Sequence, residues 1–185
     1  MLLHTPAARG CTIWLTGLPG AGKSALARAL DEKLRDLGRR VELIDGAELR
    51  ARDARAGRPR GFSRRERDEH VRHIGWVSRA LSRNGVFVVA AAVSPFREAR
   101  AWCRANAGPF VEVHVDTPLE VCAGRDPDGL YRRAFAGEIP QFTGVSDPYE
   151  APERPELSLS PATLGEPPCV DAVVAALRAR GHLPT

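Results

Sequence analysis

The chain has 185 residues, 43% of them hydrophobic, and a formal net charge of +4. This length is typical of one domain whose core needs neither disulfides nor a structural metal, so we expect a single domain over residues 1–185. Acidic residues are interleaved with the basic ones along the chain, which argues against nucleic acid as the partner and leaves room for a small anionic ligand.

The segment 17–24 reads Gly-Leu-Pro-Gly-Ala-Gly-Lys-Ser and fits the P-loop pattern. The β-rich segment 11–16 precedes it and a helix-forming segment, ending near Leu37, follows it. In that setting the loop amides and the helix start bind phosphate oxygens. We therefore predict an ATP site in which Lys23 contacts the terminal phosphates and Ser24 ligates Mg²⁺. The predicted ATP-binding residues of this segment are Gly17, Leu18, Pro19, Gly20, Ala21, Gly22, Lys23, Ser24 and Ala25.

The next segment, 41–45, is a predicted strand that ends on a carboxylate, Asp45. Parallel sheets bind ligands at this end of their strands, so we expect Asp45 to support Mg²⁺ or to polarise a substrate hydroxyl. Residues 50–64 are rich in Arg, Gly and Pro and are predicted to form a functional loop. A helix is predicted over 63–83, because Ser63 and Glu66 have the spacing of a capping box.

The second half of the chain continues this alternation. Strands are predicted at 86–93, 110–115 and 157–159, and helices from Ser94 to 104, at 119–124 and at 168–180. Residues 126–155 are rich in Pro and Gly, which is typical of a binding loop, and we expect a lid over about 126–150. The pattern predicts an α/β fold with a mostly parallel central sheet and helices on both faces.

Two further features concern the cellular location. The longest apolar run, 86–93, is far shorter than the ~20 residues that span a bilayer, and residues 1–10 lack the pattern of a signal peptide. Four widely spaced cysteines without a CxxC pair indicate reduced, buried thiols. We therefore expect a cytoplasmic protein without a membrane partner.

Taken together, the motifs resemble the adenylylsulfate (APS) kinase family, whose members have a P-loop NTPase fold. The resemblance implies a Mg²⁺-dependent kinase of sulfate assimilation that transfers the γ-phosphoryl group of ATP to the 3′-hydroxyl of APS. Family members are often dimers, which makes a homodimer an expectation here. The matching segments are 14–24, 44–46 with Arg50, 61–63, Arg67 with Glu69, Arg72 and 74–75, 94–97, 115–122, 125–127, 129–131, 136–139, 142–144 and 148–150.

The resemblance also implies roles for individual residues. Lys23, Asp45 and Ser94 would be catalytic, with Ser94 facing the substrate. Arg125 and Asp126 would lie against the adenine of ATP. Two arginines would hold the anionic group of the acceptor and two phenylalanines would enclose its base. The implied acceptor-binding residues are Asp45, Arg50, Phe62, Arg67, His70, Val93, Ser94, Asp128 and Phe142.

Three departures from the family pattern fall on the acceptor side. Ala47 stands where the family usually has an aspartate, Asp128 where it typically has a lysine, and His70 where it commonly has an asparagine. An anion in place of a cation beside a doubly negative acceptor weakens binding. Two alternatives therefore remain beside an APS kinase: a related kinase that phosphorylates another small-molecule hydroxyl, and a non-catalytic nucleotide-binding subunit.

Overall fold

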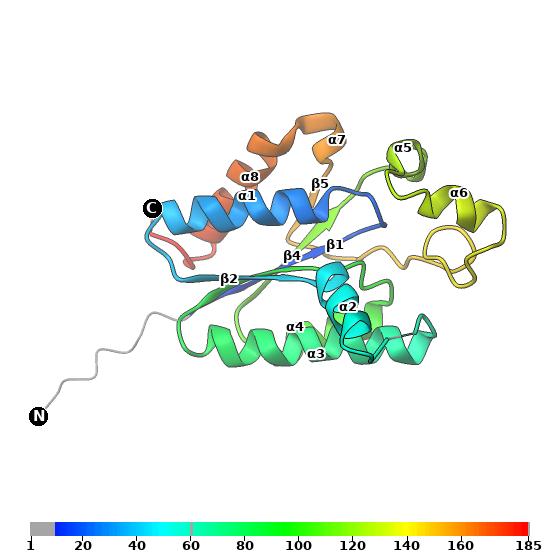
Figure 1. Cartoon of the computed structure of the whole chain (residues 1–185). Helices are drawn as coiled ribbons and strands as arrows, with labels where there is room; N and C mark the ends of the chain where they lie inside the picture. The colour runs from blue at the N-terminus through cyan, green and yellow to red at the C-terminus, as the bar shows by residue number, and fades with distance from the viewer. Residues whose placement is uncertain (1–9, 60, 185) are drawn as a thin grey trace, which may run out of the picture.

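The computed structural model describes residues 10–59 and 61–184, and a five-stranded sheet lies at its centre (Figure 1). The strand order is β2-β3-β1-β4-β5, and every pairing within it is parallel, which confirms the predicted α/β class. The strands are β1 (Thr12–Thr16), β2 (Val41–Asp45), β3 (Phe87–Ala91), β4 (Phe110–Val115) and β5 (Leu157–Leu159). The predictions about residues 1–9 and 60 lie outside the described residues.

Helices cover both faces of the sheet (Figure 1). One core lies between the sheet and α1 and α8, and it includes Ile13 and Leu15 of β1. The other lies between the sheet and α3 and α4, and it includes Trp14. Because successive side chains of β1 point to opposite faces of the sheet, this strand contributes residues to both cores. The helices are α1 (Lys23–Asp36), α2 (Gly46–Arg55), α3 (Arg64–Ser82), α4 (Arg97–Asn106), α5 (Leu119–Arg125), α6 (Leu130–Phe135), α7 (Pro161–Leu164) and α8 (Glu166–Ala179).

The strand register places the predicted site at one edge of the sheet. Ala91 of β3 is aligned with Leu15 of β1 on one side and with Asp45 of β2 on the other. The phosphate-binding loop follows β1 directly, and residues 92–95 follow β3. Because all three strands end at the same edge, the loop, Asp45 and the turn after β3 come together there.

Two predicted boundaries are wrong. Arg50–Arg55, expected in a loop, belong to α2, whose first amides at Ala47 and Glu48 are capped by the side chain of Asp45. The helix-forming residues between 47 and 55 outweigh the Gly and Pro that follow them. Helix α4 begins at Arg97 and not at Ser94, whose backbone is left-handed with φ of 40°. The predicted capping box of Ser63 and Glu66 is confirmed.

The four cysteines are free and buried, as expected. Burial raises the pKa of Cys11 and of Cys103 to about 12, so both thiols remain protonated. No helix within residues 10–59 and 61–184 is long and apolar enough to cross a membrane.

Candidate active site

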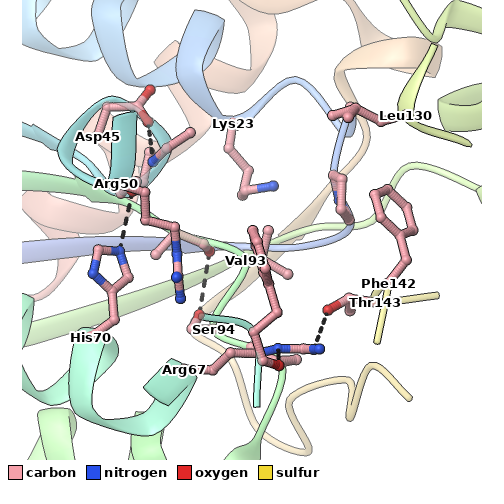
Figure 2. A pocket seen from close by; sticks show the side chains of 18 of the residues that line it. Lys23, Asp45, Arg50, Arg67, His70, Val93, Ser94, Leu130, Phe142 and Thr143 are labelled. Carbon is pink, nitrogen blue, oxygen red and sulfur yellow. Dashed lines mark hydrogen bonds between the residues drawn. The ribbon is translucent and has the colours of Figure 1, made fainter. Parts of the chain in front are cut away.

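A cavity of about 720 Å³ lies at this edge of the sheet. The phosphate-binding loop, the start of α2, helix α3, the turn after β3 and the predicted lid all contribute to its wall. Figure 2 shows Lys23, Arg50 and Arg67 extending into this space from different elements. Most of the predicted ATP and acceptor residues therefore meet in a single cavity.

The phosphate-binding loop has the backbone that its sequence predicts. Gly17 lies so close to β4 that a Cβ atom there would be 2.5 Å from the carbonyl oxygen of Val115. Gly20 has φ of 73° and Gly22 has φ of 99°, and both are left-handed conformations that favour glycine. Pro19, Gly20, Lys23 and Ser24 line the cavity. The loop is thus shaped to direct backbone amides toward a phosphate chain.

Lys23 is the cation at the centre of this loop and is only 8% exposed. Its Nζ donates hydrogen bonds to the carbonyl oxygens of Gly17, at 2.9 Å, and Leu18, at 2.6 Å. Burial lowers the pKa of Lys23 to about 8, against the opposing effects of Cys122 and Asp45. A buried ammonium held by neutral carbonyls is poised to gain from the negative charge of a phosphate.

This lowered pKa makes nucleotide binding depend on pH. Phosphates beside Lys23 favour the charged amine, so we expect ADP binding to take up part of a proton near pH 8 and to weaken as the pH rises from 7.5 to 9.5. Calorimetry in two buffers of different ionisation enthalpy measures the proton uptake. An affinity that stays constant over this range would contradict the assignment.

Asp45 lies at the end of β2 and lines the cavity. Its Oδ1 accepts the amides of Ala47, at 2.9 Å, and Glu48, at 3.3 Å. Within the described residues there is no group of three or more His, Cys, Asp or Glu side chains that could hold a metal. Mg²⁺ in kinases commonly takes one or two protein oxygens and completes its shell with phosphates and water. The hydroxyl of Ser24 and the carboxylate of Asp45, on the wall of one cavity, fit this requirement.

The acceptor half of the cavity contains the two predicted phenylalanines. Phe62 is 54% exposed, and the guanidinium of Arg50 lies 5.2 Å from its ring centroid. Nη1 of Arg50 also donates to the carbonyl oxygen of Gly61 at 3.0 Å. Phe142 lies edge-on to Tyr131, with ring centroids 5.0 Å apart. An exposed aromatic face and a supported one on the same cavity wall suit a planar base.

Arg67 connects helix α3 to the lid and is 4% exposed. It donates to Thr143 Oγ1 at 2.8 Å and to Asp147 Oδ2 at 2.6 Å, and it also contacts the carbonyl oxygen of Gln141. His70 is buried one turn farther along α3, where Nε2 lies 3.1 Å from the carbonyl oxygen of Gly46. His70 therefore links α3 to the first residue of α2, which supports a structural role.

Ser94 lines the cavity beside Val93 and is 2% exposed. The hydroxyl accepts from Trp14 Nε1 at 3.1 Å and donates to Thr16 Oγ1 at 2.9 Å. These hydrogen bonds occupy the hydroxyl within the fold, and the expectation that it faces the substrate stays a prediction.

Two other predicted residues lie apart from the cavity wall. Among the described residues, those that line the cavity do not include Arg125 or Asp126. The carboxylate of Asp126 accepts the amides of Tyr131 and Arg132 and so caps α6. Their proximity to adenine stays a prediction. Asp128, by contrast, does line the cavity.

The lid contributes residues that the sequence did not single out. Leu130 and Arg133 of α6, together with Ile139, Gln141 and Thr143, line the cavity. The lid motifs around these residues predicted that the segment contributes to the site. They did not predict which of its side chains point into the cavity. Part of the expected lid segment therefore lines the cavity, and its function as a lid stays a prediction.

Comparisons with known proteins agree with this geometry. A sequence model of the family described as adenylylsulphate kinase matches residues 9–160. An adenylyl-sulfate kinase of Synechococcus sp. (strain JA-2-3B'a(2-13)) is 46% identical over 175 residues, which are 95% of this chain and 98% of the relative. The structure of the Mycobacterium tuberculosis APS kinase in complex with AMPPNP and APS has a TM-score of 0.85 and 41% identity, and the match covers 92% of this chain and 98% of that one. The chain therefore belongs to the adenylylsulphate kinase family.

Proposed function

We propose that this protein transfers the γ-phosphoryl group of ATP to the 3′-hydroxyl of APS and releases ADP. The observation that carries the proposal is a single cavity in which a phosphate-binding loop faces a pair of arginines and a pair of phenylalanines. The first group suits a nucleoside triphosphate, and the second suits a nucleotide with an anionic group. The Mycobacterium tuberculosis relative, described with AMPPNP and APS, has the same two kinds of ligand.

Phosphoryl transfer needs alignment and charge neutralisation more than a strong base. Lys23 and the loop amides hold the phosphates of ATP and neutralise charge that spreads over the transferred group. Ser24 and Asp45 would hold Mg²⁺, which would supply positive charge to offset that of the phosphates. In this proposal Asp45, on the wall of the same cavity, also accepts a hydrogen bond from the attacking hydroxyl.

The acceptor residues complete the alignment. Arg50 and Arg67 hold the anionic group of APS, because a planar guanidinium makes paired hydrogen bonds with phosphate and sulfate. Phe62 and Phe142 hold its adenine by stacking. The lid covers the bound pair and excludes water, which suppresses hydrolysis of ATP.

The test is ADP release from Mg²⁺·ATP with APS and, in parallel, with a panel of other hydroxyl-bearing metabolites. We expect turnover with APS and formation of 3′-phosphoadenylylsulfate in equal amount to ADP. Turnover with another acceptor and none with APS would overturn the proposal that APS is the acceptor, and the protein would still be a kinase. Nucleotide binding without transfer to any acceptor would indicate a non-catalytic subunit.

A second candidate, a kinase for a different acceptor, is favoured by two residues of the cavity wall. Ala47 lines the cavity without the carboxylate that the family usually has at this position, and Asp128 adds a negative charge to the acceptor side. The Ala47→Asp variant distinguishes the two candidates. A gain of APS turnover would favour an APS kinase with a weakened site, whereas loss of activity on another acceptor would favour a repurposed one.

The charge of residue 128 gives a direct prediction for APS. The Asp128→Lys substitution replaces repulsion by attraction, so we expect the KM for APS to fall about tenfold while the KM for ATP stays within about twofold. Steady-state kinetics in both substrates measure this. The control Glu120→Lys makes the same charge change on exposed α5 and should leave both constants unchanged. A higher KM for APS in Asp128→Lys would contradict the proposal.

A further inference from the structure

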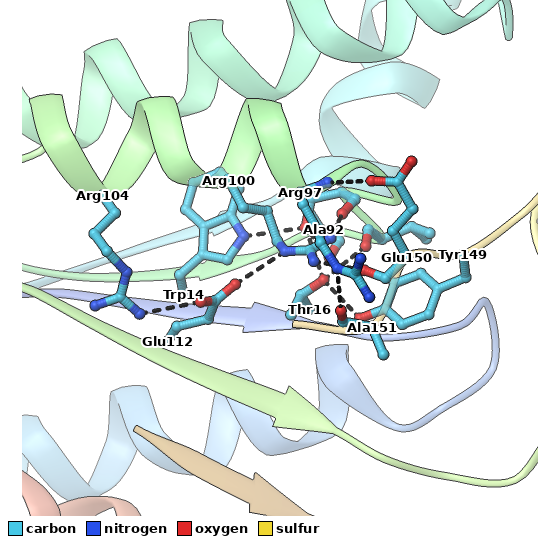
Figure 3. Close-up of polar contacts among 12 residues, drawn as sticks. Trp14, Thr16, Ala92, Arg97, Arg100, Arg104, Glu112, Tyr149, Glu150 and Ala151 are labelled. Carbon is cyan, nitrogen blue, oxygen red and sulfur yellow. Dashed lines mark hydrogen bonds and ion pairs between the residues drawn. The ribbon is translucent and has the colours of Figure 1, made fainter. Parts of the chain in front are cut away.

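A chain of hydrogen bonds joins the end of β1, the turn after β3 and the end of the lid (Figure 3). Trp14 Nε1 donates to Ser94 Oγ, and Ser94 Oγ lies 2.9 Å from Thr16 Oγ1. The hydroxyl of Tyr149 lies 3.0 Å from Thr16 Oγ1. Thr16 Oγ1 in turn donates to the carbonyl oxygen of Val93 at 2.8 Å.

The single proton of Ser94 has two acceptors within reach, and Thr16 Oγ1 at 2.9 Å is nearer than the carbonyl oxygen of Ala92 at 3.3 Å, so we assign it to Thr16. An indole nitrogen can only donate, and a threonine hydroxyl has one proton. Because Thr16 gives its proton to Val93, it accepts from both Ser94 and Tyr149. Burial raises the pKa of Tyr149 to about 12, so the phenol keeps the proton that it donates. Thr16 Oγ1 thus makes three hydrogen bonds at a site with no exposure to solvent.

A buried arginine strengthens the same junction. Arg100, 3% exposed, donates to the carbonyl oxygens of Ser94 and Glu150, both at 2.5 Å, and to Glu112 Oε1 at 2.9 Å (Figure 3). The left-handed backbone of Ser94 costs roughly 1–3 kcal/mol in a residue other than glycine. Such a conformation persists where the surroundings determine it, and here contacts from β1, α4 and the end of the lid do so.

Each segment that meets at Thr16 also reaches the cavity. Thr16 directly precedes Gly17, whose carbonyl oxygen holds Lys23. The turn after β3 supplies the cavity wall from Val93 to Pro95. Tyr149 ends the lid, whose residues Phe142 and Thr143 line the cavity on the acceptor side.

We propose that Thr16 and Tyr149 are positioning residues that hold the end of the lid and the acceptor-side wall against the phosphate-binding loop. Neither hydroxyl touches a substrate in this assignment. Their effect is to keep the lid seated while the phosphoryl group is transferred, so that the acceptor and not water receives it. The inference rests on the proposed kinase activity and adds to it the means by which the lid and the loop are coupled.

The test replaces one hydroxyl in each residue. Tyr149→Phe keeps the stacking of the ring on His114, with centroids 5.8 Å apart, and its contact with the Arg100 guanidinium. We expect kcat to fall about tenfold, the ratio of ADP to phosphorylated product to rise at least about threefold, and the KM for ATP to stay within about twofold. Loss of stability alone would not change that ratio.

Two variants of Thr16 make the test specific. Thr16→Val removes the hydroxyl and its three hydrogen bonds, so it should have at least the effect of Tyr149→Phe. Thr16→Ser keeps the hydroxyl and should keep kcat and the product ratio at their wild-type values. In Thr16→Val, adding Tyr149→Phe should have little further effect, because both changes break the same contact. The matched control is Ser78→Ala, which removes a buried hydroxyl bonded to Ile74 within α3, away from the cavity.

The outcomes separate the inference from the proposed function. A wild-type protein that forms no phosphorylated product from APS would overturn both. A wild type that turns over, with Tyr149→Phe and Thr16→Val keeping kcat and the product ratio within about twofold, overturns the positioning role alone. Effects of the two substitutions that simply add in the double variant would overturn it as well.

Discussion

Replacing Lys23 with methionine is expected to lower kcat about 10³-fold while the protein remains folded at neutral pH. The ammonium group is the cation that faces the phosphates of ATP from within the loop, and methionine fills similar space without charge. Steady-state ADP release measures the loss. The matched control is Lys33→Met, which removes the other lysine of the chain from an exposed position on the same helix and should leave kcat unchanged.

The stability of Lys23→Met tests the physical argument separately. In the folded protein without nucleotide, burial lowers the pKa of Lys23 from 10.5 to about 8, so below pH 8 the charged amine destabilises the fold by about 3 kcal/mol. The unfolded chain binds more protons between pH 8 and 10.5, so the stability of the wild type rises over that range. The variant should therefore be at least as stable as the wild type at pH 7, and its advantage should shrink toward pH 10.5.

Thermal unfolding of both proteins at several pH values tests this relation. A variant that unfolds at a much lower temperature than the wild type at pH 7 would show that Lys23 is structural. A loss of less than about tenfold in kcat would show that another group neutralises the phosphates.

The donor side of the site was predictable because its chemistry is local. The loop, its preceding strand and its following helix lie within about 25 consecutive residues, and the glycine positions are dictated by nearby backbone. Asp45 was also predictable from local sequence, because a carboxylate at the end of a predicted parallel strand lies at the ligand-binding edge of the sheet. The strand that it ends pairs with β3. Its second function as the cap of α2 was missed, and with it the helix that begins there.

The acceptor side was predictable as a set of residues but not as a set of contacts. Arg67 bonds to Thr143 and Asp147, which are 76 and 80 positions away in the chain. Ser94 bonds to Thr16 across 78 positions. Periodicity and local motifs carry no information on such pairs, so the inward turn of the Ser94 hydroxyl could not be derived from them. The resemblance supplied the residues, and the tertiary fold decided which atoms face the cavity.

The largest effect on the acceptor side is expected for Arg67→Ala. The side chain is buried and is bonded to the lid through Thr143, Gln141 and Asp147. The substitution leaves Asp147, whose side chain is 26% exposed, and the other lid oxygens without their donor, so we expect a loss of about 3 kcal/mol in the free energy of unfolding and a fall in Tm of roughly 10 °C. Because this guanidinium also holds the anionic group of the acceptor in the proposed function, the KM for APS should rise about 30-fold with little change in the KM for ATP.

A neighbouring arginine on the same helix provides the control for Arg67→Ala. The side chain of Arg65 is 86% exposed and pairs with Glu69 along α3. Exposed pairs of this kind contribute about 0–1 kcal/mol, so Arg65→Ala should change Tm by at most about 3 °C and leave both KM values unchanged. Calorimetric unfolding and kinetics at a temperature well below both transitions separate the two effects. A normal KM for APS in folded Arg67→Ala would show that the buried arginine serves the lid alone, and that Arg50 holds the anionic group without it.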